Sequence, residues 1–271
     1  MNKKKRFNEI VRKIKNVEIQ GAKNVARAAL EAYFLLPSKD SKEKLMSSRP
    51  TEPMMFYVLN LAEKGVSKKE ILNHFEFSQK EINKHVLKLI NNRDVIFTHC
   101  HSTNVVNSLI YSKKKGKKFK VYNTETRPLF QGRKTAVELM KNGIDVTMFV
   151  DSAAAFAIKK DDKSDKIYVD KIFLGADALL KKGVINKIGS GMFAEIASRN
   201  KIPVYIIADS WKFTKDKIKI EQRSLNEVWD KSPKNIKIKN PAFEFIKRKY
   251  ISGIITELGL MKYKEFLRKI K

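Results

Sequence analysis

The 271-residue chain has one cysteine, 11 glycines, 7 prolines and only 29 acidic residues against 57 lysines and arginines. A single cysteine excludes an internal disulfide and is typical of a reducing compartment, so we expect a cytoplasmic protein. No stretch approaches the roughly 18 apolar residues that span a bilayer, so we expect no membrane partner. The basic start, Met1–Arg6, is followed by polar and charged residues where a secretion signal needs an apolar segment.

The formal net charge of +28 raises the question of a nucleic-acid partner. The densest basic cluster, Lys113–Lys118 (KKKGKK), has no interleaved aromatic residues and lies between a predicted helix and a predicted strand. Lysines are also spread over the rest of the chain. We therefore interpret the cluster as a solvated connection and expect only nonspecific binding of nucleic acid. A dedicated nucleic-acid-binding protein is an alternative that rests on the charge alone.

Hydrophobic spacing divides the chain into two halves. From Phe7 to about Asn92 apolar residues repeat at intervals of three and four, which predicts a helical N-terminal domain over residues 1–92. Beyond it, short β-branched and aromatic runs alternate with amphipathic segments such as Thr135–Asn142 and Phe193–Asn200. The predicted fold class is therefore α/β: the helical domain, then a Rossmann-like open parallel sheet over residues 93–271 with helices on both faces.

The predicted strands all end next to polar residues. The strands are Val95–Thr98, Phe119–Asn123, Val146–Val150, Lys171–Leu174, Val204–Ala208 and Ile251–Thr256. In an open parallel sheet a ligand binds beyond the carboxyl ends of the strands. The polar residues that a site there would recruit are His99, Cys100, Glu125, Asp151, Asp177, Asp209 and Glu257. The polar stretch Asp161–Lys166 is predicted to be an exposed loop.

Two motifs suggest ligand sites but fit them poorly. His99, Cys100 and His101 are adjacent, and adjacent residues on a strand point to opposite faces, which disfavours a metal site. Gly189 and Gly191 in NKIGSGMFAE match neither the Walker nor the dinucleotide fingerprint. We therefore predict no metal and no nucleotide bound through this loop.

Cys100 and Asp177 are the stronger candidates. Cys100 ends a predicted strand, and Ser102 and Thr103 can cap the next helix, so its thiolate should be favoured by the helix N-terminus. Asp177 follows another strand, and burial there should raise its pKa. A thiol and a carboxyl group that face one crevice can act as a proton-transfer pair. The simpler interpretations are a structural cysteine and a turn carboxylate.

Several long segments carry a family resemblance. They are VEIQGAKNVARAA, SSRPTEP, VIFTHCHST, TETRPLFQGRKTAVELMKNGIDVTMFVDSAA, GADALLKKGVINKIGSGMFAEIA, NPAFEFI and IITELG. Together they resemble the superfamily of initiation factor 2B alpha, beta and delta subunits, ribose-1,5-bisphosphate isomerase and methylthioribose-1-phosphate isomerase. The resemblance extends over nearly the whole chain.

The resemblance implies an isomerase. The isomerases of this superfamily have a cysteine in THC and an aspartate in GAD, which match Cys100 and Asp177, whereas the initiation-factor subunits typically lose the pair. The THCHS form, VINKIG and the WKF segment are most similar to the archaeal ribose-bisphosphate enzymes. The implied reaction converts ribose 1,5-bisphosphate to ribulose 1,5-bisphosphate in the salvage of nucleotides such as AMP, without a metal or organic cofactor.

The resemblance also implies roles for individual residues. Cys100 is the implied base at C2 of the sugar, and Asp177 assists ring opening. The implied phosphate-binding and sugar-binding residues are Gln20, Gly21, Ala22, Arg49, Asn186, Lys187 and Lys212.

Two of these segments depart from the family pattern. Gln20 stands where the isomerases have arginine, and Ser190 replaces a threonine. An alternative is therefore a regulatory subunit, similar to the initiation factor, that binds a sugar phosphate or nucleotide without turning it over. Either class implies a homo-oligomer, a dimer or a hexamer.

Overall fold

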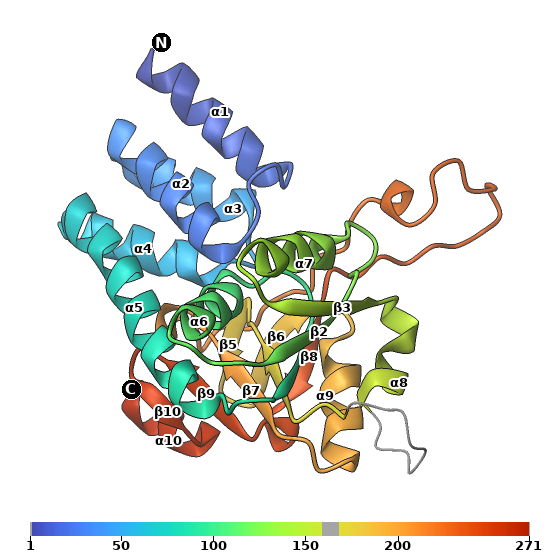
Figure 1. Ribbon diagram of the computed structural model, residues 1–271. Coiled ribbons are helices and arrows are strands. Elements are labelled where there is room, and N and C mark those ends of the chain that lie inside the picture. Colours follow the sequence, from blue (N-terminus) through green and yellow to red (C-terminus); the bar gives the residue numbers. More distant parts are fainter. Residues whose placement is uncertain (1, 159–167, 271) are drawn as a thin grey trace.

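The computed structural model describes residues 2–158 and 168–270, so the predicted loop at Asp161–Lys166 lies outside the described residues. The first part of the chain is helical, as its spacing predicted, and forms one end of the molecule (Figure 1). Its helices are α1 (Lys3–Lys15), α2 (Ala22–Leu35), α3 (Lys39–Ser48), α4 (Pro53–Glu63) and α5 (Lys68–Leu89). They enclose an apolar core that includes Ile14, Leu30 and Leu59.

Helix α5 links the two halves of the molecule. Its N-cap Ser67 accepts a hydrogen bond from the Glu70 amide at 3.2 Å, which fixes the first turn. Ile71 and Phe75, near its start, lie in the helical core, whereas Ile82 and Val86, near its end, pack against the sheet. The predicted domain boundary after residue 92 therefore does not separate the two hydrophobic cores, because α5 contributes side chains to both of them.

A mostly parallel sheet forms the second half, as predicted. Among the described residues it has seven strands in the order β10-β9-β7-β4-β1-β2-β3, and only the β10–β9 pair is antiparallel. The strands are β1 (Val95–Thr98), β2 (Lys120–Thr124), β3 (Asp145–Phe149), β4 (Lys171–Leu174), β7 (Val204–Ile207), β9 (Gly253–Thr256) and β10 (Gly259–Met261). Two of these, β1 and β4, have the predicted bounds, while β10 was not predicted.

Helices cover both faces of the sheet. On one face lie the end of α5, α6 (Thr103–Lys114) and α7 (Gln131–Lys141), and Ile96 packs among them. On the other lie α8 (Ala154–Ile158), α9 (Ser190–Arg199) and α10 (Tyr263–Lys269), with Phe97 among them. Neighbouring residues of β1 thus serve opposite cores, because side chains alternate along a strand. The connection Lys113–Lys118 between α6 and β2 is largely exposed, as expected.

A smaller antiparallel sheet, which the sequence analysis missed, lies beside the main one. It pairs β5 (Ala178–Leu180), β6 (Gly183–Lys187) and β8 (Phe243–Lys247). Its strands are short, and every residue of β6 is buried, so they lack the alternating pattern that identifies a strand. Between β7 and β8 the chain forms the turns η2 (Ser210–Lys212) and η3 (Leu225–Glu227) and projects from the body as an arm (Figure 1).

Candidate active site

A cavity of about 140 Å³ lies beyond the carboxyl ends of β1 and β4. These two strands are neighbours in the sheet, but the chain continues from β1 to β2 and β3 on one side and from β4 to β7 and β9 on the other. Such a point, where the strand order diverges, is where open α/β sheets bind ligands. The start of α2 and the segment before α4 also line the cavity.

The structure brings to this one cavity all of the site residues that the family resemblance implied, whereas Glu125, Asp151, Asp209 and Glu257, which were also expected at the strand ends, do not line it. The implied residues are Gln20, Gly21, Ala22, Arg49, Cys100, Asp177, Asn186, Lys187 and Lys212. They come from both halves of the chain, so no spacing within one segment could have predicted their meeting. Their individual roles remain predictions.

Cys100 follows β1 in a constrained backbone position. Its φ of 66° lies in the left-handed region, which costs a non-glycine residue on the order of 1–3 kcal/mol. Two threonines hold it there: its amide donates to Thr126 Oγ1 at 3.0 Å, and its carbonyl accepts from Thr135 Oγ1 at 2.8 Å. These two hydrogen bonds therefore hold the backbone from which the thiol extends.

The electrostatics of Cys100 differ from the prediction. Burial raises the pKa of the thiol to about 11, and Lys187 opposes this shift without overcoming it. The helix that was expected to favour a thiolate begins at Thr103, and its N-cap Ser102 makes no side-chain capping bond within the described structure. Desolvation thus outweighs the helix N-terminus, and the thiol is protonated at neutral pH.

Asp177 lies in the turn between β4 and β5, three residues beyond the end of β4, rather than at the end of a strand. Its amide donates to the Ile185 carbonyl at 2.8 Å, which ties the turn to β6. Burial raises the pKa of its carboxyl group, as predicted, while Lys212, Lys187 and Arg49 act in the opposite direction. Asp177 is therefore suited to hold a proton inside the cavity.

Three cations predicted from the sequence surround Asp177. Lys187 belongs to β6, Lys212 to η2, and Arg49 follows α3, and all are buried. Lys212 Nζ donates to the Ala176 carbonyl at 2.6 Å, which holds it beside Asp177. The sequence analysis missed three more cations that line the cavity: Lys23, Lys134 and Arg223. In so basic a chain, their residue type alone could not distinguish them.

The start of α2 presents backbone amides to the cavity. Gly21 is the N-cap and has a φ of 85°, a conformation that glycine adopts without strain. Gln20 precedes it and is exposed, and its carbonyl accepts a bond from Asn24 Nδ2 at 3.0 Å. A helix N-terminus of this kind favours anions.

Glu52 is a further lining residue that the sequence analysis missed. It is the N-cap of α4, is only 1% exposed and lies 3.4 Å from Arg49 Nε through its Oε1 atom. Burial raises its pKa to about 7, with Asp177 and Glu221 adding to the shift and Arg49 and Lys212 opposing it. Its place in SSRPTEP, next to Arg49, is the only sequence signal that could have pointed to it.

The two histidines beside Cys100 have structural partners. His99 Nε2 donates to the Ile188 carbonyl at 2.8 Å, so its Nδ1 accepts from the Thr124 hydroxyl at 2.5 Å. His101 Nδ1 lies 3.0 Å from Thr135 Oγ1. Burial lowers the pKa of each imidazole to about 4, so both are neutral at pH 7. Within the described residues these two side chains and Cys100 form no group that could ligate a metal.

The glycine segment at α9 does not offer a free phosphate loop. Gly189 is the N-cap of α9 with a φ of 99°, and the Gly191 amide donates to Glu244 Oε1 at 2.8 Å. A carboxylate of the chain itself therefore occupies an amide that a phosphate would need. This agrees with the poor match of the segment to nucleotide-binding motifs.

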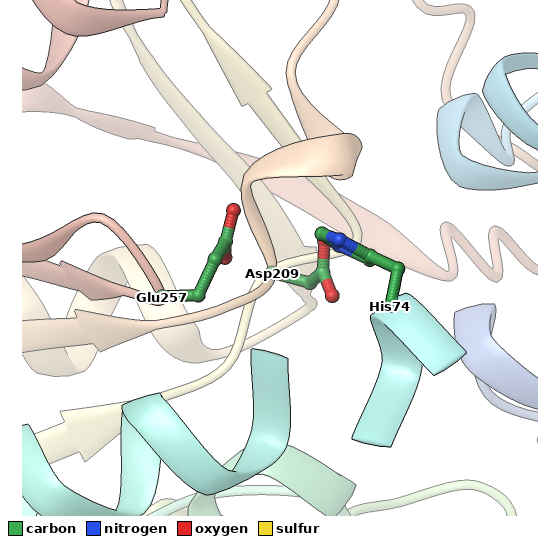
Figure 2. A group of neighbouring side chains, drawn as sticks. All are labelled: His74, Asp209 and Glu257. Carbon is green, nitrogen blue, oxygen red and sulfur yellow. The ribbon is translucent and has the colours of Figure 1, made fainter. Parts of the chain in front are cut away.

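A second polar cluster joins α5 to the ends of β7 and β9. Figure 2 shows its members, His74, Asp209 and Glu257. His74 Nε2 lies 3.2 Å from Asp209 Oδ1, and the His74 ring stacks on Trp211 with ring centroids 3.5 Å apart. Glu257 accepts from the Ser210 hydroxyl and amide. Because Trp211 and Ser210 belong to η2, this cluster fixes the turn that carries Lys212 into the cavity.

Comparisons with known proteins agree with this geometry. Residues 38–263 match the model of the Initiation factor 2 subunit family. The ribose 1,5-bisphosphate isomerase of Methanocaldococcus jannaschii is 36% identical over 93% of this chain and 90% of its own. The methylthioribose-1-phosphate isomerase of Thermosipho melanesiensis is 30% identical over 98% and 90%. The structure of the translation initiation factor eIF-2B of Pyrococcus horikoshii OT3 superposes with a TM-score of 0.84 at 26% identity, covering 98% of this chain and 99% of that one.

Proposed function

Because the chain belongs to the initiation factor 2 subunit family and is similar over nearly its whole length to sugar-phosphate isomerases, we propose that it is an aldose–ketose isomerase of sugar phosphates. The observation that carries the proposal is the meeting of Cys100 and Asp177 in one cavity lined by cations. A regulatory subunit that does not turn over its ligand has no need of a thiol and a carboxyl group facing the same space.

The proposed substrate is ribose 1,5-bisphosphate, which is converted to ribulose 1,5-bisphosphate. The similarity to the isomerase of that name supports this choice. Two phosphates require cations and amides, and the cavity supplies Arg49, Lys187 and Lys212 together with the amides at Gly21 and Ala22. Asn186, also on the cavity wall, is assigned to a sugar hydroxyl.

The proposed reaction transfers one proton between two carbon atoms of the sugar. It also requires proton transfer at the oxygen atoms of the sugar. Asp177 in its protonated form donates its proton to the ring oxygen, and the bond from that oxygen to C1 breaks, which leaves C1 electron-poor and still bonded to its phosphate. Cys100 as a thiolate then removes the proton from C2, which gives an enol between C1 and C2. The proton returns from Cys100 to C1 while the Asp177 carboxylate takes the proton of the C2 hydroxyl, so the ketose forms and both residues regain their starting states. At a pH between the pKa values of Asp177 and Cys100, the two residues together hold one proton. In the active form of the protein that proton is on Asp177. The raised pKa of Asp177 favours this arrangement, because it makes the carboxyl group a better proton holder.

The proposal also covers the assembly of the protein, its location and the source of its substrate. We propose a homo-oligomer in the cytoplasm that takes a product of nucleotide salvage, such as one derived from AMP, and uses no metal or organic cofactor. No helix in residues 2–158 and 168–270 is long and apolar enough to cross a bilayer. An apolar surface suited to self-association is exposed on β3 and α7, at Met148, Val137 and Met140.

Saturation kinetics on two substrates test the proposal. We expect a higher kcat/KM for ribose 1,5-bisphosphate than for methylthioribose 1-phosphate, because only the bisphosphate uses cations at both ends of the cavity. Asp177→Asn should abolish turnover and retain binding, since the amide keeps the size of the carboxyl group without its proton. Unchanged turnover in Asp177→Asn would assign Asp177 to the turn alone.

A further inference from the structure

Glu52 brings a second carboxyl group into the cavity, and neither the proposed chemistry nor phosphate binding uses it. It lies at the N-cap of α4 and is almost completely buried, among charged neighbours that include Arg49, Asp177 and Lys212. A buried carboxyl group in a ligand cavity is costly unless something compensates it. The Glu52 carboxyl group therefore requires a hydrogen-bonding partner.

Two polar atoms at this point lack partners. Glu52 Oε2 is buried and has no hydrogen-bond partner among the described residues, and the same holds for Arg49 Nε. The nearest approaches to Nε, Glu52 Oε1 at 3.4 Å and Glu221 Oε2 at 3.6 Å, do not have hydrogen-bond geometry. A buried acceptor and a buried donor are therefore both unsatisfied, on two residues that line the cavity. Native structures rarely leave such atoms without a partner.

A hydroxyl group is the ligand that satisfies both atoms. Its oxygen accepts from Arg49 Nε, and its proton is donated to Glu52 Oε2. A phosphate group fits this position poorly, because its oxygens and the Glu52 carboxyl oxygens are both acceptors, and the carboxyl groups of Asp177 and Glu221 lie nearby. Since a guanidinium has five N–H donors, a hydroxyl at Nε leaves Arg49 able to bind a phosphate oxygen as well.

We infer that Glu52 accepts a hydrogen bond from a ring hydroxyl of the sugar phosphate, with Arg49 Nε donating to the same oxygen. The inference rests on the proposed function, because it assumes that a sugar phosphate occupies the cavity. Glu52 then makes the site selective for hydroxylated sugars over their deoxy counterparts, because a missing hydroxyl leaves both buried atoms without a partner.

Calorimetric binding in the Cys100→Ser background, which prevents turnover, tests this role. The ligands are ribose 1,5-bisphosphate and its 2-deoxy and 3-deoxy analogues. We expect one analogue to bind at least about tenfold more weakly than the ribose compound, the loss typical of a hydrogen bond to a charged group. Adding Glu52→Ala should reduce that ratio, because only the bond from Arg49 Nε to the hydroxyl then remains, and Glu52→Gln should reduce it less, because a neutral acceptor still bonds the hydroxyl but more weakly.

Glu63→Gln is the matched control, since Glu63 lies at the other end of α4 with its side chain 44% exposed. It should leave the ratio unchanged. If Glu52→Ala does not fold, as judged by circular dichroism, Glu52→Gln decides, because it keeps the shape of the side chain. A ratio that neither Glu52 variant alters, or no discrimination against either analogue, would overturn the inference. Intact discrimination, together with no turnover of ribose 1,5-bisphosphate by the unmodified protein, would instead overturn the proposed function alone.

Discussion

Burial is the main cause of the pKa shifts of Cys100 and Asp177. Cys100 and Asp177 both have raised pKa values because the protein replaces the water that would stabilise their charged forms. That Cys100 and Asp177 line one cavity could be predicted from the sequence, and so could the direction of the Asp177 pKa shift. The direction for Cys100 could not, because it depends on how much of the protein surrounds the sulfur after folding. The prediction of a lowered pKa from a nearby helix N-terminus was wrong for that reason.

The first prediction concerns the pH dependence of kcat/KM. If the active form has a thiolate at Cys100 and a protonated Asp177, the rate is level between the two pKa values. Below the pKa of Asp177 it falls because the thiolate becomes scarcer while the carboxyl group is already protonated. Above about 11 it falls because the thiolate is saturated while protonated Asp177 disappears. Steady-state rates over a wide pH range measure both limbs.

A fall that begins near pH 8 would contradict the raised thiol pKa. The control is Cys100→Ser, which should fold normally and lose at least about a hundredfold in turnover, the lower range for a positioned general base. Near-normal turnover in a folded serine variant would remove Cys100 from the mechanism.

The second prediction concerns Gln20, which lies at the cavity where the related isomerases are expected to have arginine. Gln20→Arg restores a charged contact to one phosphate, worth roughly 1.5–3 kcal/mol. The KM for ribose 1,5-bisphosphate should therefore fall while kcat stays similar, because a remote phosphate contact is made in both the ground state and the transition state. Saturation curves for the two proteins measure this. If arginine does not tighten binding, and the unmodified protein has no isomerase activity, the regulatory alternative is favoured.

At the scale of elements, the site depends on how closely α7 approaches β2. A Cβ atom added at Gly132, in the first turn of α7, would lie 1.7 Å from the Thr124 carbonyl oxygen. Asn123 Nδ2 also donates to the Gly132 carbonyl at 2.8 Å. Because Thr135, one turn further along α7, binds the Cys100 carbonyl, the approach of α7 also positions the thiol.

The third prediction follows from this contact. Gly132→Ala should destabilise the protein by about 3 kcal/mol or more, since backbone atoms must move to admit the methyl group. Gly65→Ala is the control, because Gly65 has a φ of 87° and open space around it, so only about 1 kcal/mol of backbone strain is expected. Denaturant unfolding measures both free energies. Equal losses in the two variants would show that the α7–β2 contact is not tight.

The main sheet could largely be predicted, and the smaller sheet could not. Strands β1 and β4 are fully buried hydrophobic runs between turn signals, a pattern that identifies a strand in an α/β protein. Strand β6 reads GVINK, and its buried lysine and asparagine line the cavity. These polar residues interrupt the hydrophobic pattern by which a buried strand is recognised. Glu52 escaped prediction for a related reason, since a lone glutamate in a loop gives no sign of its burial.

At the scale of the whole molecule, the charge of +28 is spread rather than concentrated. The Lys113–Lys118 connection is largely exposed, and the salt bridges that join Arg6 to Glu31 and Arg199 to Glu195 lie at the surface in different halves of the chain. A diffuse positive surface attracts polyanions without selecting among them.

The fourth prediction is that RNA binding is weak and nonspecific. Binding to unrelated RNAs at about 50 mM salt should collapse by roughly 200 mM, as estimated for several phosphate contacts. Fluorescence anisotropy with RNAs of different sequence and equal length measures it. Tight, sequence-selective binding at the higher salt concentration would favour the nucleic-acid-binding alternative.

The central claim, that this cavity isomerises a sugar phosphate, is tested most directly by following the carbon that changes oxidation state. Purified protein is incubated with ribose 1,5-bisphosphate labelled with carbon-13 at C2, and the label is followed by NMR. The account predicts that the C2 signal moves from the alcohol to the ketone region with the unmodified protein and remains in place with Cys100→Ser. A C2 signal that stays in the alcohol region, with a protein that binds the sugar phosphate and is fully folded, would contradict the account.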